Sequence, residues 1–119
     1  MSTLSRFAFV AAAVGGMLAA PIAIAAAHPS IDIVASNWKF TPNAIELHVG
    51  ETTTLRLTSS EGVHGLQSDD LGIPQTMLMP GAFKTIDVTP KKAGTYVLHC
   101  SIMCGAGHPN MTLTVKVEQ

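Results

Sequence analysis

The chain has 119 residues, of which 47% are hydrophobic, and its formal net charge is −1 at pH 7. This length allows one small domain. The 7 Lys and Arg residues neither cluster nor outnumber the 8 Asp and Glu residues, which argues against a nucleic-acid-binding protein.

The first part of the chain, residues 1–27, differs from the rest. Arg6 is its only charged residue, and residues 7–18 form an apolar run. Pro21 breaks the run and Ala25-Ala26-Ala27 is a suitable cleavage site, so a secretory signal peptide is predicted. An uncleaved N-terminal anchor is the alternative, because the apolar stretch is roughly long enough to span a bilayer. Both hypotheses place the remaining domain, residues 28–119, in the periplasm or another extracytoplasmic compartment.

Residues 28–119 show the period-two alternation of apolar and polar residues that is typical of β-strands. In one run, Ile45 and Leu47 alternate with Glu46 and His48. The alternating runs cover residues 31–35, 45–49, 52–58, 83–88, 95–100 and 111–117. About seven short strands at this spacing predict an all-β protein with a β-sandwich fold.

A short loop after residues 95–100 carries the most distinctive chemistry of the chain. It contains Cys100, Cys104, His108 and Met111. Thiolate and thioether ligands select copper, and imidazole suits copper too. Zinc is less suitable, because a thioether contributes little to a zinc site and the spacing is not that of a zinc finger. The loop therefore predicts a copper site, while a Cys100–Cys104 disulfide in a purely structural module is the alternative for an exported protein.

The pattern Cys-x-x-x-Cys-Gly-x-x-His-x-x-Met, which begins at Cys100, resembles the ligand loop of the dinuclear CuA copper centre. That centre occurs in subunit II of cytochrome c oxidase and in nitrous oxide reductase. Residues 62–66 resemble the upstream ligand segment of those proteins, and residues 37–47 resemble the early strands of cupredoxins. The resemblance extends over nearly all of residues 31–118 and implies a cupredoxin-like Greek-key sandwich.

The resemblance also implies a metal site and its ligands. The thiolates of Cys100 and Cys104 would bridge two copper ions, so that one electron is shared between both metals. The implied ligands are His64, Cys100, the backbone carbonyl of Ile102, Cys104, His108 and Met111. A mononuclear blue-copper site built from one cysteine, both histidines and the methionine is the intermediate alternative.

The leading functional hypothesis is an exported electron-transfer protein, similar to oxidase subunit II, that is not itself an enzyme. The expected partners are a c-type cytochrome or another exported redox protein, and a terminal oxidase. Oxidase subunit II normally has two membrane helices before its copper domain, whereas this chain has at most one apolar segment there. The alternative function is a periplasmic copper carrier that loads copper into an oxidase. Membrane contact is expected only if the N-terminal segment stays uncleaved.

Five further residues have both a functional and a simpler structural interpretation. His48 and His99 occupy positions that alternate with inward-facing neighbours, so both are predicted to point away from the metal. Met77 and Met79 share one side of an extended segment and could pass Cu(I) to the site, although methionine more often fills gaps in a core. Trp38 could assist electron transfer, although a single tryptophan is most often a packing residue.

Overall fold

The computed structural model describes residues 12–20 and 28–119. Residues 12–20 are exposed and contain neither helix nor strand. The rest of the predicted signal segment, residues 1–11 and 21–27, lies outside the described residues. Within these two described ranges, no helix is long and apolar enough to cross a membrane.

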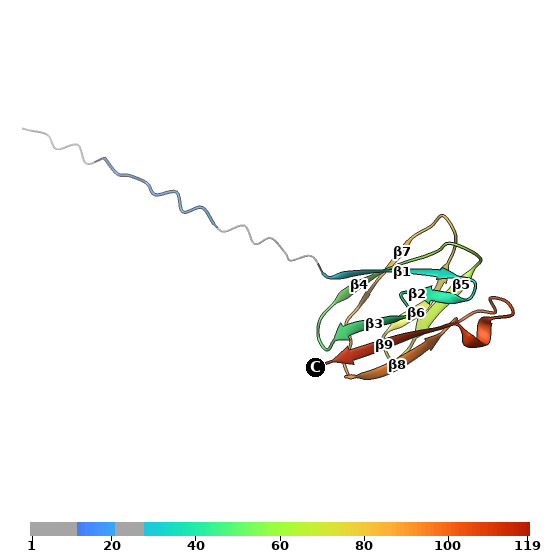
Figure 1. Cartoon of the computed structure of the whole chain (residues 1–119). Coiled ribbons are helices and arrows are strands. Elements are labelled where there is room, and N and C mark those ends of the chain that lie inside the picture. Colours follow the sequence, from blue (N-terminus) through green and yellow to red (C-terminus); the bar gives the residue numbers. More distant parts are fainter. Residues whose placement is uncertain (1–11, 21–27) are drawn as a thin grey trace, which may run out of the picture.

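The regular structure of residues 28–119 consists of strands apart from one short 3-10 turn, which confirms the predicted all-β class (Figure 1). The strands are β1 (Ser30–Ser36), β2 (Lys39–Thr41), β3 (Ala44–His48), β4 (Thr53–Ser59), β5 (His64–Ser68), β6 (Ile73–Leu78), β7 (Lys84–Val88), β8 (Gly94–His99) and β9 (Thr112–Glu118). The described part of the chain thus has nine strands where the sequence predicted about seven. The strands β2, β5 and β6 lie outside the alternating runs.

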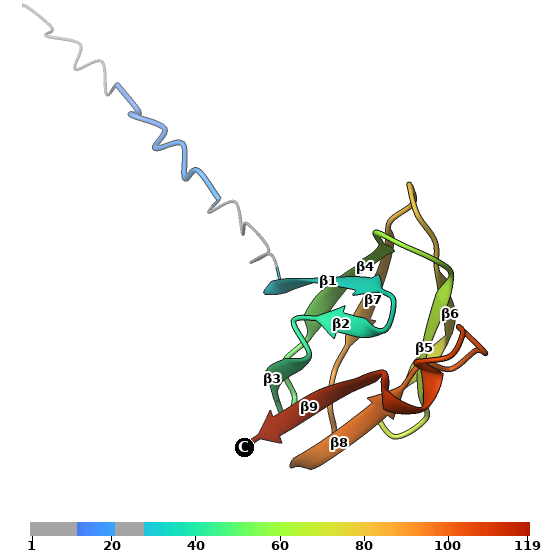
Figure 2. The same cartoon turned by 45° about the vertical axis from the view of Figure 1, so that its right-hand side comes forward.

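The strands form the two layers of a sandwich. One layer is the sheet β2-β1-β4-β7, in which β1 and β4 are parallel. The other layer combines the sheet β3-β9-β8, in which β3 and β9 are parallel, with the hairpin β5–β6. The N–H of Ser101 donates to the carbonyl of Gly65 at 3.0 Å. The chain leaving β8 therefore lies beside β5, at the end of the sandwich where the loop from Cys100 begins (Figure 2).

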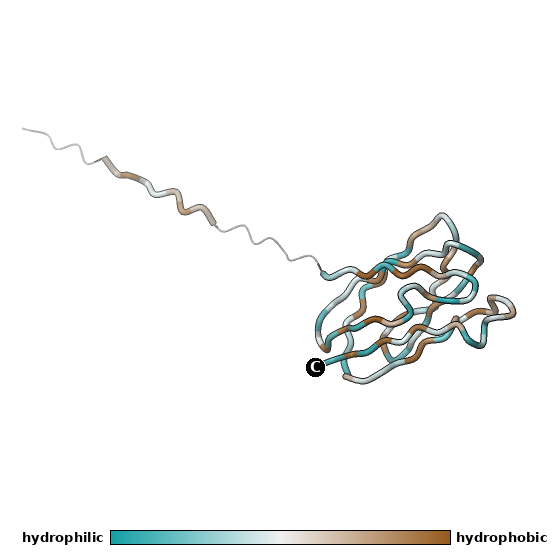
Figure 3. The backbone as a smooth tube through the Cα atoms, in the orientation of Figure 1, coloured by the Kyte–Doolittle hydropathy of each residue, from teal (hydrophilic) through white to brown (hydrophobic). Residues whose placement is uncertain are grey.

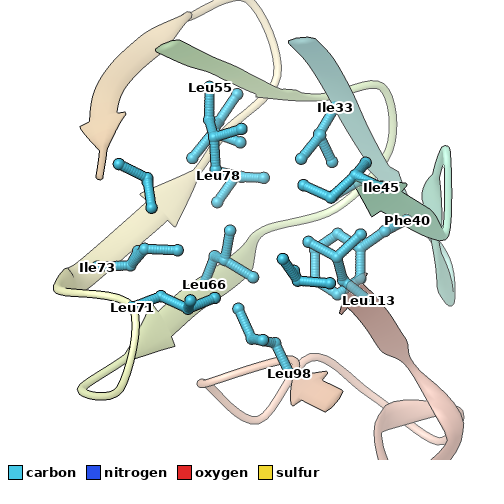
Figure 4. Close-up of a cluster of buried hydrophobic side chains, with 14 of the residues drawn as sticks. Ile33, Phe40, Ile45, Leu55, Leu66, Leu71, Ile73, Leu78, Leu98 and Leu113 are labelled. Atoms are coloured by element: carbon cyan, nitrogen blue, oxygen red, sulfur yellow. The ribbon is translucent and has the colours of Figure 1, made fainter. Parts of the chain in front are cut away.

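The core fills the space between the layers. Ile33 and Leu55 of the first layer, Leu98 and Leu113 of the second, and Leu66 of the hairpin belong to one cluster, and each is at most 4% exposed (Figure 4). Apolar stretches recur along the strands, as Figure 3 shows. Burying each such side chain stabilises the fold by roughly 1.5–3 kcal/mol. The loop from Cys100 is therefore attached to a rigid body.

The hairpin β5–β6 has the register that places a histidine inside the protein. His64 pairs with Leu78, and both are buried, while Gly65 pairs with Met77 on the opposite face. Pro74 lies within β6, where it is tolerated because β6 pairs on one side only and has a free edge. The hairpin thus presents His64 to the end of the core where the loop from Cys100 lies.

Candidate metal centre

Backbone hydrogen bonds close the base of the loop between β8 and β9. The N–H of Cys100 donates to the carbonyl of Met111 at 3.1 Å, and the N–H of Met111 donates to the carbonyl of His108 at 3.2 Å. A short 3-10 turn covers His108–Asn110, and Pro109 suits the first positions of such a turn because it needs no backbone donor there. These bonds hold both ends of the loop in place.

His64, the first residue of β5, is fully buried and oriented by a backbone carbonyl. Its Nε2 lies 2.8 Å from the carbonyl oxygen of Glu61, so Nε2 donates the hydrogen bond and Nδ1 keeps a free lone pair. That Nδ1 lies 4.0 Å from Sγ of Cys100. A metal-binding histidine is usually oriented in this manner, because its other ring nitrogen donates a hydrogen bond to a carbonyl or a carboxylate.

The second cysteine has a corresponding set of neighbours. Sγ of Cys104 lies 3.4 Å from Nδ1 of His108 and 3.7 Å from Sδ of Met111. Sγ of Cys100 lies 3.4 Å from the carbonyl oxygen of Ile102. Each thiol sulfur therefore has one imidazole nitrogen of its own and one weaker donor.

The three central donor groups are close enough to hold a metal ion together. The ligand atoms of His64, Cys100 and Cys104 all lie within 4.8 Å of one another. Both cysteines carry free thiols in the structure, so the alternative Cys100–Cys104 disulfide is not formed there. The arrangement offers soft sulfur and imidazole donors, which is the ligand set that copper prefers.

Protonation of one thiol opposes metal binding. Burial raises the pKa of the Cys104 thiol to about 11, and the neighbouring Cys100 adds to the effect. The metal-free site therefore holds Cys104 protonated at neutral pH. Because a metal binds the thiolate, binding releases a proton and the apparent metal affinity falls as the pH falls.

Trp38 contacts the loop from the side and was not predicted to do so. Its indole Nε1 donates to the carbonyl of Cys104 at 2.8 Å, across a sequence separation of 66 residues. A Cβ at Gly105 would lie 2.8 Å from Nε1 of Trp38, and a Cβ at Gly107 would overlap Cγ and Cδ2 of the same ring. The indole thus lies directly against these glycines, and the absence of side chains there lets it pack on the loop.

The structure brings together all the residues that were expected to form the site. They are His64, Cys100, Ile102, Cys104, His108 and Met111. His64, Cys100 and Met111 are buried, whereas Ile102, Cys104 and His108 are half-buried. Their proximity is observed, and their assignment as ligands is part of the proposal below.

His48 and His99 lie outside the group, as predicted. Both are exposed, and His99 alternates with the buried residues Leu98 and Cys100. We therefore expect His99→Ala to leave the copper content and the absorption spectrum of the loaded protein unchanged, with a stability change within about 0.5 kcal/mol. Metal analysis and thermal unfolding would check this. His108→Ala is the matched comparison, and a larger copper loss from His99→Ala than from His108→Ala would contradict the placement.

Residues 7–115 match the family model of the cupredoxin-like domain. Cytochrome c oxidase subunit 2 of Thermus thermophilus is 30% identical to this chain over 90 residues, which cover 76% of this chain and 66% of that protein. A second subunit 2 sequence from T. thermophilus matches at the same identity over 53% of its length. The chain therefore spans between about half and two thirds of the length of these relatives.

Solved structures have the same fold. A chain of a heme-copper terminal oxidase dimer superposes with a TM-score of 0.66 at 26% identity, covering 76% of this chain and 65% of that one. The periplasmic domain of subunit II of cytochrome oxidase from Bradyrhizobium japonicum superposes with a TM-score of 0.69 at 16% identity, covering 80% and 87%. At that identity the second similarity shows the fold alone.

A β-sandwich that carries a His/Cys/Cys group at one end defines this protein as a cupredoxin, and the fold and the group together suggest copper. The chain belongs to the cupredoxin-like domain family and is homologous to subunit II of cytochrome c oxidase. This confirms the family resemblance found in its ligand loop.

Proposed function

We propose that this chain holds two copper ions in a CuA-type centre and passes single electrons between exported redox proteins. The observation that carries the proposal is the paired arrangement of donors around two sulfurs. Nδ1 of His64 faces Sγ of Cys100 at 4.0 Å, and Nδ1 of His108 faces Sγ of Cys104 at 3.4 Å. A mononuclear site uses one cysteine, and it would leave the other sulfur and its neighbours without a role.

The weaker donors complete the proposed ligand set. The thioether of Met111 lies next to Cys104, and the carbonyl of Ile102 lies next to Cys100. Each proposed copper would then bind both thiolates, one imidazole and one of these weak donors. Copper bound in this way supplies one-electron oxidation and reduction.

The contribution of the chain is to keep the donors in place. His64 is held by the carbonyl of Glu61, and Cys104 is held through its own carbonyl by Trp38. His64 and Met111 are completely buried, so water has little access from the core side. Such a site favours electron transfer over substrate turnover, and we assign the protein as an electron-transfer component rather than an enzyme.

The proposed setting is the periplasm or another extracytoplasmic compartment, reached through the N-terminal signal segment. The relatives are subunits of cytochrome c oxidase, and the Bradyrhizobium japonicum domain is described as periplasmic. We propose a c-type cytochrome or a similar exported redox protein as one partner and a terminal oxidase as the other.

Electron paramagnetic resonance of the copper-loaded protein tests the centre. We expect two copper ions per chain and hyperfine coupling of one unpaired electron to two copper nuclei. Coupling to a single nucleus with one copper per chain would instead establish the mononuclear site and refute the dinuclear proposal.

A copper carrier is the second candidate, and exposure of the ligand loop favours it. Met103, between the two cysteines, is 84% exposed. Mixing the loaded protein with a metal-free copper domain separates the two functions. Reduction by a c-type cytochrome without metal loss supports the electron shuttle, whereas rapid transfer of copper to the metal-free domain supports the carrier.

A further inference from the structure

Two exposed methionines lie at the end of the hairpin β5–β6, Met77 within β6 and Met79 one residue beyond it. Met77 is 41% exposed and Met79 is 47% exposed, while Leu78 between them is 1% exposed. The two methionines therefore lie on the same outer face, and they do not fill gaps in the core, which was the commoner role considered from the sequence. Both side chains are therefore accessible at the surface.

Met77 lies on a face of the hairpin that is adjacent to the candidate metal centre. Met77 pairs with Gly65, which follows His64. A Cβ at Gly65 would overlap Oγ of Ser101 and would lie 3.1 Å from Cγ2 of Ile102. The start of the ligand loop thus covers Gly65, and cross-strand neighbours on one face have Cβ positions about 5 Å apart. Met77 is consequently adjacent to the loop that carries both cysteines.

The spacing of the two methionines suits one shared ion. Residues two apart along a strand are separated by about 6.6 Å, and each methionine side chain is long and unbranched with three rotatable bonds. Two thioether sulfurs can therefore converge on an ion above the strand. Thioethers are soft ligands that select Cu(I) over harder divalent ions.

From this geometry we propose that Met77 and Met79 form a surface site that captures Cu(I) and passes it to the thiols of Cys100 and Cys104. The transfer exchanges thioether ligands for thiolates, copper stays Cu(I), and each thiol that binds releases its proton to solvent. Met103, the residue before Cys104, supplies a third exposed thioether on the ligand loop. The inference rests on the proposed copper centre, because it supplies the metal for that centre.

The capture site can be tested apart from the centre. In a Cys100→Ala/Cys104→Ala variant, titration with Cu(I) against a chromophoric competitor is expected to show one bound ion per chain. Adding Met77→Leu and Met79→Leu is expected to weaken this binding at least about tenfold, because leucine keeps the apolar volume and removes the sulfur. Val63→Ala, at another exposed apolar residue next to the hairpin, is the matched control and should bind Cu(I) normally.

Filling of the intact centre gives a second measurement that does not depend on the folding of the cysteine variant. With Cu(I) supplied from a weak chelator, Met77→Leu/Met79→Leu is expected to fill the two thiols at least about tenfold more slowly, since the soft surface ligands are gone. The final copper content should equal that of the parent. Equal filling rates, or equal Cu(I) affinity with leucine at both positions, would overturn the proposal and leave this face as an apolar contact surface. Neither result depends on whether the filled centre is dinuclear.

Discussion

Replacing Cys104 with serine is expected to lower the copper content of the loaded protein from two ions per chain to at most one. Sγ of Cys104 is the group that lies near both Nδ1 of His108 and Sδ of Met111. A serine hydroxyl stays protonated at neutral pH and is a hard donor, so it does not replace a soft thiolate on copper. The remaining electron-spin signal should couple to a single copper nucleus.

The loss should be specific to the metal, because Cys104 is only half-buried and exposed or half-buried substitutions change stability little. Ala106→Ser, an exposed position in the same loop, introduces the same hydroxyl without removing a donor and is the matched control. It should keep both copper ions. Retention of two ions and of a two-nucleus spectrum by Cys104→Ser would show that Cys104 does not bridge the metals.

Most of the sandwich could be predicted because its strands bury one face and expose the other. Ile45 and Leu47 in β3, for example, are buried while their neighbours are exposed. The alternation did not predict the hairpin β5–β6, because the hairpin breaks this rule. His64 is a buried polar residue, Gly65 has no side chain, and Pro74 is a residue that strands usually exclude.

The candidate site likewise has a part that the sequence pattern predicts and a part that it does not. The residues from Cys100 to Met111 belong to one loop, so their proximity follows from the sequence. The position of His64 depended on the family resemblance, because local patterns do not reveal that β5 lies beside the chain leaving β8. Packing was the commoner role considered for Trp38, but the sequence did not reveal that it packs on this loop, since that depends on the tertiary contact of the indole with Gly105 and Gly107.

That contact supports the second large prediction, that Gly107→Ala weakens copper binding without unfolding the domain. The added methyl group would overlap the ring of Trp38, so either the indole or the loop must shift. Either shift disturbs the hydrogen bond from Nε1 to the carbonyl of Cys104. Disturbing groups that orient metal ligands typically lowers metal affinity by roughly 10- to 100-fold. Competition with a copper chelator measures the affinity, and fluorescence of the single tryptophan reports whether the ring has moved.

A double-mutant cycle separates the effect of Trp38 from that of the loop backbone. Trp38→Gly removes both the ring and the Cβ with which the methyl group would collide, so Gly107→Ala should cost much less copper affinity in that background. Trp38→Phe keeps an aromatic ring against the glycines and removes the Nε1 donor, so it isolates the hydrogen bond to Cys104. An equal loss from Gly107→Ala in both backgrounds would place the effect in the loop backbone. A loss that disappears with the indole would establish Trp38 as a residue that positions Cys104 for copper.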